Sequence, residues 1–290
     1  MAILLGLTAA LAWGVSGLFA REVSSALGAW RGLFTTQLFG LLVLMVPLIG
    51  AMAGPGLDAD LAAAPAQAWV VAGIAALANT TATLSLYQAY RSGSLALAVP
   101  ISSSYGVLTT AFAVLAGEAL AMVEAVGIAL AAGGLALAGV RGRNPAAGDA
   151  HLASIGWALL ASAQYGFVFW SMGFFVAPHL GGLVPIVITR ALAVLVLGGI
   201  GWMRGLGMGL PHGPLCRRAA LVGLLDAIAF VSLTLGLGLG TDTVGVVTVL
   251  GSLYSAVGAV LAFLVLRERL AVHQWSGVAA IIAGVVALNL

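Results

Sequence analysis

The amino-acid sequence predicts an all-α polytopic membrane protein, with ten transmembrane helices arranged as two inverted five-helix repeats around a central cavity. Composition is the first observation. Of 290 residues, 62% are hydrophobic and 7% are charged, and the mean hydropathy is +1.16. Soluble domains carry about 25% charged residues, and no soluble fold of this length could hide so much apolar surface. The second observation is an internal repeat, in which residues 117–134 match residues 267–284 at an offset of 150.

Apolar runs of about 20 residues, the length that crosses a bilayer, predict the individual helices. In chain order they are 3–20, 29–50, 67–90, 94–117, 123–140, 152–175, 182–203, 217–237, 243–266 and 272–289. The first run has no basic residue before it and no cleavage pattern after it, so we expect a retained helix rather than a signal peptide. The longer connections are 51–66, which contains Gly54-Pro55-Gly56, and 204–216, which contains glycines, two prolines and His212.

The stretch from Arg141 to His151 is the one obvious linker between two sets of five runs. The expected domains are therefore a first repeat at 1–143, a linker at 144–151 and a second repeat at 152–290. Because five is an odd number of crossings, a tandem copy enters the membrane in the opposite orientation. The repeats are therefore expected to be inverted about an axis in the membrane plane, with a substrate site where they meet.

Arginines predict the orientation, since the chain contains no lysine. Nine of them fall on odd-numbered connections or the adjoining helix ends: Arg21, Arg91, Arg141, Arg143, Arg204, Arg217, Arg218, Arg267 and Arg269. Basic connections stay in the cytoplasm, so this pattern predicts that both termini lie outside.

Several classes of function are disfavoured by composition. The single cysteine, Cys216, excludes an internal disulfide, and the four histidines lie in connections or at helix ends without metal spacing. Neither a metal nor a cofactor is expected. ATP hydrolysis would need a Gly-x-x-x-x-Gly-Lys motif, and a net charge of +2 gives no indication of a nucleic-acid partner. An enzyme is not expected, whereas a channel stays open as an alternative.

The two copies of the repeat carry a recognisable signature. Leu115-Ala116-Gly117-Glu118-Ala119-Leu120 is followed by Gly127, and Leu266-Arg267-Glu268-Arg269-Leu270 is followed by Gly277. This pair resembles the signature of the drug/metabolite transporter superfamily, and more narrowly that of its ten-helix EamA-type members. Supporting features are Ala12-Trp13-Gly14, Gln164-Tyr165-Gly166, Arg31, Arg190 and Pro100.

The resemblance implies a basket of ten helices around a central cavity. Bacterial members of this family commonly export amino acids, other metabolites or toxic compounds, so the resemblance also implies an exporter. In many relatives both termini are thought to lie in the cytoplasm, which is the reverse of the arginine prediction.

Asp226 is the one carboxylate placed deep in an expected helix, and Arg190 is an arginine at a similar depth in the preceding helix. A charge inside the membrane is costly, so it should face the interior or find a partner. Two interpretations stay open: a proton-coupling or substrate-ammonium site at Asp226, or a structural Asp226–Arg190 pair that ties two helices together.

Hydroxyl and aromatic side chains are expected to line the cavity. Thr80, Thr83, Tyr87 and Tyr90 share one helix face, with Asn79 and Gln88 beside them. At the offset of 150, Ser102 corresponds to Ser252 and Tyr105 to Ser255, and Thr248 and Tyr254 lie beside these two serines. The candidates for aromatic walls are Trp13, Tyr165 and Trp170. Such hydroxyls also bond to their own helix, so a structural role is the alternative for each. Glu118 and Glu268 are interpreted as structural residues of the turns.

These features predict a secondary transporter in the bacterial inner (plasma) membrane that exports small metabolites by alternating access. Its partners would be the lipid bilayer and a small-molecule substrate. Hydroxyls and aromatic rings without excess charge favour neutral amino acids, including aromatic ones. Cationic drugs are the alternative, because Asp226 could hold a positive charge, and proton coupling is open. A chain that carries both repeats is expected to function as a monomer.

Overall fold

The computed structural model describes residues 1–54, 61–117, 122–139, 148–237, 250–251 and 253–287. Within these ranges every regular element is helical. The elements are α1 (Ala2–Leu27), α2 (Ala29–Met52), α4 (Ala66–Ser92), α5 (Leu95–Ser103), α6 (Tyr105–Leu115), α7 (Met122–Gly139), α8 (Gly148–Ser171), the π-helix η2 (Met172–Val176), α9 (Ala177–Leu180), α10 (Leu183–Met203), α11 (Pro214–Leu237), α13 (Tyr254–Val265) and α14 (Val272–Ala287).

Five helical stretches among the described residues are long and apolar enough to cross a membrane. They are Ile3–Leu27, Ala29–Met52, Ala66–Ser92, His151–Leu180 and Leu183–Met203, and each coincides with an expected run. The shorter apolar helices are Leu95–Thr109, Ala125–Leu137, Tyr254–Val265 and Val272–Ala287. The structure is therefore that of an all-helical, polytopic membrane protein, and length and composition alone account for five of the ten expected crossings.

The fourth expected run, 94–117, is not one continuous helix. It divides at Ser104 into α5 and α6, where the Ser104 N–H bonds to the carbonyl of Ile101, three residues back, as in a 3₁₀ turn. Pro100, inside α5, cannot donate a backbone hydrogen bond. The hydroxyls of the three serines that follow donate to carbonyls three residues back, with Ser104 Oγ 2.7 Å from the oxygen of Ile101. Elsewhere α8 already begins at Gly148, inside the expected linker. Residues 243–249 of the ninth expected run lie outside the described residues.

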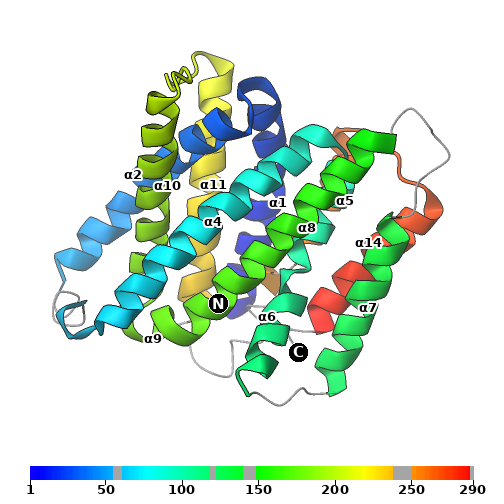
Figure 1. Cartoon of the computed structure of the whole chain (residues 1–290), viewed down its shortest axis with the longest axis horizontal. Helices are drawn as coiled ribbons and strands as arrows, with labels where there is room; N and C mark the ends of the chain where they lie inside the picture. The colour runs from blue at the N-terminus through cyan, green and yellow to red at the C-terminus, as the bar shows by residue number, and fades with distance from the viewer. Residues whose placement is uncertain (55–60, 118–121, 140–147, 238–249, 252, 288–290) are drawn as a thin grey trace.

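The helices pack in pairs that join the two halves of the chain. The main pairs are α1 with α11, α4 with α8, α2 with α10, and α7 with α14. In Figure 1, α7 and α14 lie side by side at one end of the molecule, while α2 and α10 lie at the other end. A hydrophobic core cluster, which includes Leu33, Leu95 and Ile101, packs between the halves.

Two glycines permit the closest approach of α7 to α14. A Cβ atom added at Gly134 would lie 2.6 Å from the carbonyl oxygen of Gly277, and one added at Gly284 would lie 2.5 Å from that of Gly127. Small residues at a crossing let helix backbones approach where lipid offers no hydrophobic drive. Residue numbers rise along one helix as they fall along the other, so the two helices are antiparallel.

The turn after α13 contains a left-handed residue that is not glycine. Arg267 has a φ of 55°, and the residue at the same place in the first repeat, Gly117, has a φ of 104°. A non-glycine residue in this region costs about 1–2 kcal/mol. We therefore expect Arg267→Gly to stabilise the protein by about 1 kcal/mol.

This prediction is measured as a rise of roughly 2–4 °C in the apparent melting temperature of the purified protein. Arg269→Gly is the matched control, because it removes an exposed arginine two residues away that has no positive φ. An equal response of both variants would mean that the backbone at Arg267 is unstrained.

Candidate functional site

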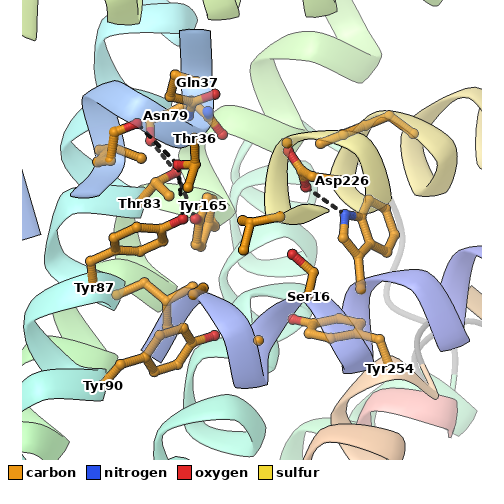
Figure 2. A pocket seen from close by; sticks show the side chains of 18 of the residues that line it. Ser16, Thr36, Gln37, Asn79, Thr83, Tyr87, Tyr90, Tyr165, Asp226 and Tyr254 are labelled. Carbon is orange, nitrogen blue, oxygen red and sulfur yellow. Dashed lines mark hydrogen bonds between the residues drawn. The ribbon is translucent and has the colours of Figure 1, made fainter. Parts of the chain in front are cut away.

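A cavity of about 140 Å³ lies at the junction of helices from both halves of the chain. Its polar lining residues converge from opposite sides (Figure 2). The polar and aromatic lining residues are Trp13, Ser16, Thr36, Gln37, Asn79, Thr83, Tyr87, Tyr90, Tyr105, Tyr165, Phe169, Arg190, Asp226, Phe230 and Tyr254. A cavity with aromatic walls and a few convergent polar groups is typical of a small-molecule site.

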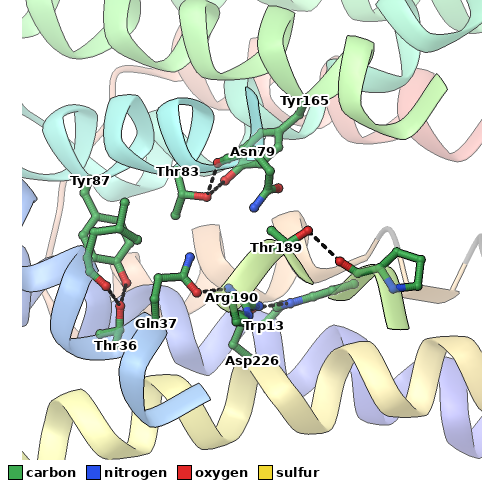
Figure 3. A network of polar contacts seen from close by, with 12 residues as sticks. Trp13, Thr36, Gln37, Asn79, Thr83, Tyr87, Tyr165, Thr189, Arg190 and Asp226 are labelled. Atoms are coloured by element: carbon green, nitrogen blue, oxygen red, sulfur yellow. Dashed lines mark hydrogen bonds and ion pairs between the residues drawn. The ribbon is translucent and has the colours of Figure 1, made fainter. Parts of the chain in front are cut away.

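Asp226 and Arg190 stand at the centre of a four-helix network (Figure 3). Trp13 on α1 donates its Nε1 hydrogen to Oδ1 of Asp226 on α11 at 2.9 Å. The Arg190 guanidinium, on α10, donates to Oδ2 of Asp226 and also to Oε1 of Gln37 on α2. Its Cζ atom lies 5.3 Å from the centroid of the Phe230 ring, which adds a cation–π contact. The two intramembrane charges are therefore paired.

Two donor groups of the network lack an acceptor among the described residues. Arg190 Nε and Gln37 Nε2 are buried, and neither has a hydrogen-bond partner among the described residues. An unpaired buried donor costs about 1–3 kcal/mol. Asn79, which also lines the cavity, adds a side-chain amide with two further donor hydrogens. This side of the cavity is therefore rich in donors that an incoming acceptor could satisfy.

Tyrosines form the remaining walls and are fixed by hydroxyl pairs between helices. The Tyr87 hydroxyl lies 3.0 Å from Thr36 Oγ1, and the Tyr165 hydroxyl lies 2.9 Å from Thr83 Oγ1. Tyr105 stacks on Phe169 with ring centroids 4.5 Å apart. These contacts hold the rings against the cavity, so its apolar part is pre-formed.

The residues expected at the site from the sequence divide into three groups. Those that line the cavity are Trp13, Thr83, Tyr87, Tyr90, Tyr105, Tyr165, Arg190, Asp226 and Tyr254. Those that the structure places elsewhere are Thr80, Ser102, Trp170 and Ser255. Thr248 and Ser252 lie outside the described residues.

Local chemistry explains the second group. Thr80 and Ser102 are buried and donate to carbonyls of their own helices, at 2.8 and 2.9 Å, and Ser255 is fully buried. Trp170 belongs instead to an aromatic cluster with Phe112 and Phe175. A helical hydroxyl that bonds its own backbone offers less to a ligand.

Gln37, Thr36 and Ser16 are cavity residues that the sequence analysis missed. Gln37 lies 153 residues before its partner Arg190, which is close to the repeat offset of 150. Applying that offset to Arg190 gives Gly40, which lies one helical turn from Gln37 on α2. Ser16 and Thr36 carried no comparable signal, because single hydroxyls in apolar helices are usually structural.

Glu268 forms a second polar cluster at the membrane face that carries the connections after α1, α4, α10 and α13, here called the arginine-bearing face. Its carboxylate accepts a charged hydrogen bond from Arg21, a bond of 2.7 Å from Ser94 Oγ, and bonds from the backbone N–H groups of Leu95 and Ala96. A carboxylate at a helix N-terminus satisfies groups that have no partner within the helix. We call this arrangement the Glu268 clamp.

The clamp joins α1, the start of α5 and the turn between α13 and α14. Ala20, the residue before Arg21, and Leu33 are buried and line the cavity. Glu118, its counterpart in the first repeat, lies outside the described residues. No group of His, Cys, Asp or Glu that could hold a metal ion occurs within the described ranges.

Comparisons with known proteins agree with this architecture. The sequence model of the EamA-like transporter family matches residues 1–140. A crystal structure of another protein, 22% identical in sequence, has a TM-score of 0.62 and covers 99% of this chain and 94% of that chain. At this identity the likeness concerns the fold alone, and it extends over both halves. No curated protein matches the sequence.

Proposed function

We propose, from the match of the EamA-like transporter family model to residues 1–140, that the protein is a secondary transporter that exports small metabolites by alternating access. The observation that supports it best is the central cavity, which is lined by helices of both halves. Binding at the junction of two repeats lets one half rock against the other around a fixed site. A single chain supplies both halves, so we propose that the monomer is functional.

We also propose ten crossings in two inverted repeats, 1–143 and 152–290. Helix pairs recur when the repeat offset is applied: α1 with α11 corresponds to α8 with α4. The contact of Gly134 with Gly277 corresponds likewise to that of Gly284 with Gly127. Because α7 and α14 are antiparallel, an axis that exchanges them is perpendicular to both. For helices that cross a bilayer, such an axis lies in the membrane plane.

Neutral amino acids, including aromatic ones, are the proposed substrates. The aromatic walls suit an apolar side chain, and the cavity contains one carboxylate and one guanidinium that could contact an ammonium and a carboxylate. Export of organic cations is the second candidate, and it is favoured by the partly exposed carboxylate of Asp226. With the arginine-bearing face in the cytoplasm, both termini would lie outside.

Counterflow in proteoliposomes tests the proposal. Vesicles preloaded with unlabelled amino acids, nucleosides, sugars or quaternary amines are given the same labelled solute outside. Trans-stimulated uptake of an amino acid is the expected result, and it identifies a carrier. Downhill flux without trans-stimulation would instead identify a channel, and stimulation by cations alone would favour the second candidate.

A matched pair of substitutions then tests whether the solute passes through the cavity. Gly17 lines the cavity, and a Cβ added there meets only the Tyr90 hydroxyl, at 3.8 Å, whereas one added at Gly73 on α4 meets nothing within 4 Å. We expect Gly17→Leu to fill the cavity and lower the initial counterflow rate by about tenfold or more. Gly73→Leu should leave the rate unchanged, and equal rates in both variants would place the transport path elsewhere.

A further inference from the structure

We infer that the Asp226–Arg190 pair selects solutes that carry both an ammonium and a carboxylate, and rejects solutes of the same shape that carry one charge. The inference rests on the proposed function, since it concerns the same cavity. It assigns the pair a role in specificity: an internal ion pair that a zwitterion can open and that a singly charged solute cannot.

The charge inventory of the cavity is the first argument. Asp226 and Arg190 are the one acidic and the one basic residue that line it among the described residues, and they are bound to each other. The cavity lining is therefore electrically neutral. A buried charge is tolerated when it is paired and is strongly unfavourable when it is not.

This inventory makes a singly charged solute a poor ligand. An ammonium group that binds Asp226 competes with Arg190 for one negative charge, and Arg190, whose side chain is 6% exposed, has no second carboxylate in the cavity lining to pair with. A carboxylate that binds Arg190 leaves Asp226 unpaired in the same way. A zwitterion supplies a new partner to each residue, so the number of paired charges is preserved.

The geometry of the pair suits such an exchange. Trp13 holds Oδ1 of Asp226 at 2.9 Å, so the carboxylate stays in place if Oδ2 changes its partner from Arg190 to a ligand ammonium. The Asp226 side chain is 23% exposed and lines the cavity. The ammonium is therefore expected on the α11 side of the cavity.

The donor groups beside Arg190 suit a carboxylate. Arg190 Nε and Gln37 Nε2 are buried without an acceptor among the described residues, and Arg190 Nη1 is held by Gln37. A carboxylate can accept two parallel hydrogen bonds from a guanidinium. A ligand carboxylate that reached this place would supply acceptors for donors that have none among the described residues.

The test compares three solutes that share one ring: phenylalanine, phenethylamine and 3-phenylpropionate. Binding of each to the full-length protein in nanodiscs is measured by calorimetry and by competition. We expect phenylalanine to bind at least about tenfold more tightly than either singly charged analogue. Leucine, isopentylamine and 4-methylpentanoate repeat the comparison for an aliphatic side chain.

A neutral pair distinguishes this role from a purely structural one. In the double variant Asp226→Asn/Arg190→Gln no charge remains to be left unpaired, so the three solutes should bind within about threefold of one another. The control double variant, Glu22→Gln/Arg218→Gln, removes an ion pair of 3.1 Å in which both partners are substantially exposed. It should keep the wild-type ranking.

The outcomes separate the inference from the proposed function. Equal binding of the three solutes to the wild-type protein, with counterflow intact, overturns the inference and leaves the carrier in place. Preference for phenylalanine that survives in the neutral double variant also overturns it, because the selectivity would then arise elsewhere. If no organic solute is carried, the proposed function fails first. The wild-type comparison decides the matter even if the double variant does not fold.

Discussion

Replacing Glu268 by glutamine is expected to destabilise the protein by about 3 kcal/mol. Glutamine keeps the size of the side chain but retains one acceptor oxygen, and its amide nitrogen would face donors. The four groups that now donate to the carboxylate are Arg21, Ser94 Oγ and the backbone N–H groups of Leu95 and Ala96. The Glu268 side chain is 12% exposed, so water cannot fully replace the lost bonds.

A fall of about 5 °C or more in the apparent melting temperature would measure this loss. Glu22→Gln is the matched control, since Glu22 also pairs with an arginine at the same face, but with its side chain 39% exposed. Exposed pairs contribute about 0–1 kcal/mol. If both variants lose the same stability, the Glu268 clamp is no stronger than a surface ion pair.

The Glu268 clamp also makes a prediction about access to the cavity. It binds α5 of the first half to the α13–α14 turn of the second half, so opening the arginine-bearing face requires it to break. We expect Glu268→Gln to speed labelling of Ala20→Cys, a cavity-lining position, by an impermeant thiol reagent applied from that face. Both proteins would carry Cys216→Ser, which removes the single native cysteine. Unchanged labelling would mean that the face is closed by packing alone.

The long membrane-spanning helices, whose apolar length is set by the lipid bilayer, could be predicted from the sequence. Apolar length identified the five long helices, because a bilayer requires about 20 apolar residues whatever the tertiary structure. The break at Ser104 was missed because hydropathy does not register a local change in backbone hydrogen bonding, here the bond from the Ser104 N–H to the carbonyl of Ile101, three residues back.

Cavity residues could be predicted from the sequence where placing the side chain inside the membrane carries a large free-energy cost. An aspartate deep in an apolar helix must find a partner, and that argument led to Asp226 and Arg190. Hydroxyl groups carry no such cost, since they can bond to their own helix. Thr80 and Thr83 both donate to carbonyls of their own helix, but Thr83 also contacts the Tyr165 hydroxyl on α8. Helix rotation decides between these outcomes, and packing sets that rotation.

Gly134→Ala and Gly284→Ala are each expected to destabilise the protein by about 1–3 kcal/mol, the usual range for overpacking. In both variants the new methyl group would meet backbone atoms, at 2.6 Å or less from a carbonyl oxygen, and backbone cannot move aside as a flexible side chain can. The α7–α14 crossing must then widen along its length. Gly133→Ala is the control, because a Cβ at that neighbouring position meets nothing within 4 Å.

The double variant Gly134→Ala/Gly284→Ala tests whether the two glycines act at one crossing. Sites that share contacts are not additive, whereas distant sites add within about 0.5 kcal/mol. Once one alanine has separated α7 from α14, the second enters a gap that already exists. We therefore expect the two single variants to lose equal stability and the double variant to lose less than their sum. Full additivity would contradict a shared crossing, and unequal single losses would contradict the two-fold relation between α7 and α14.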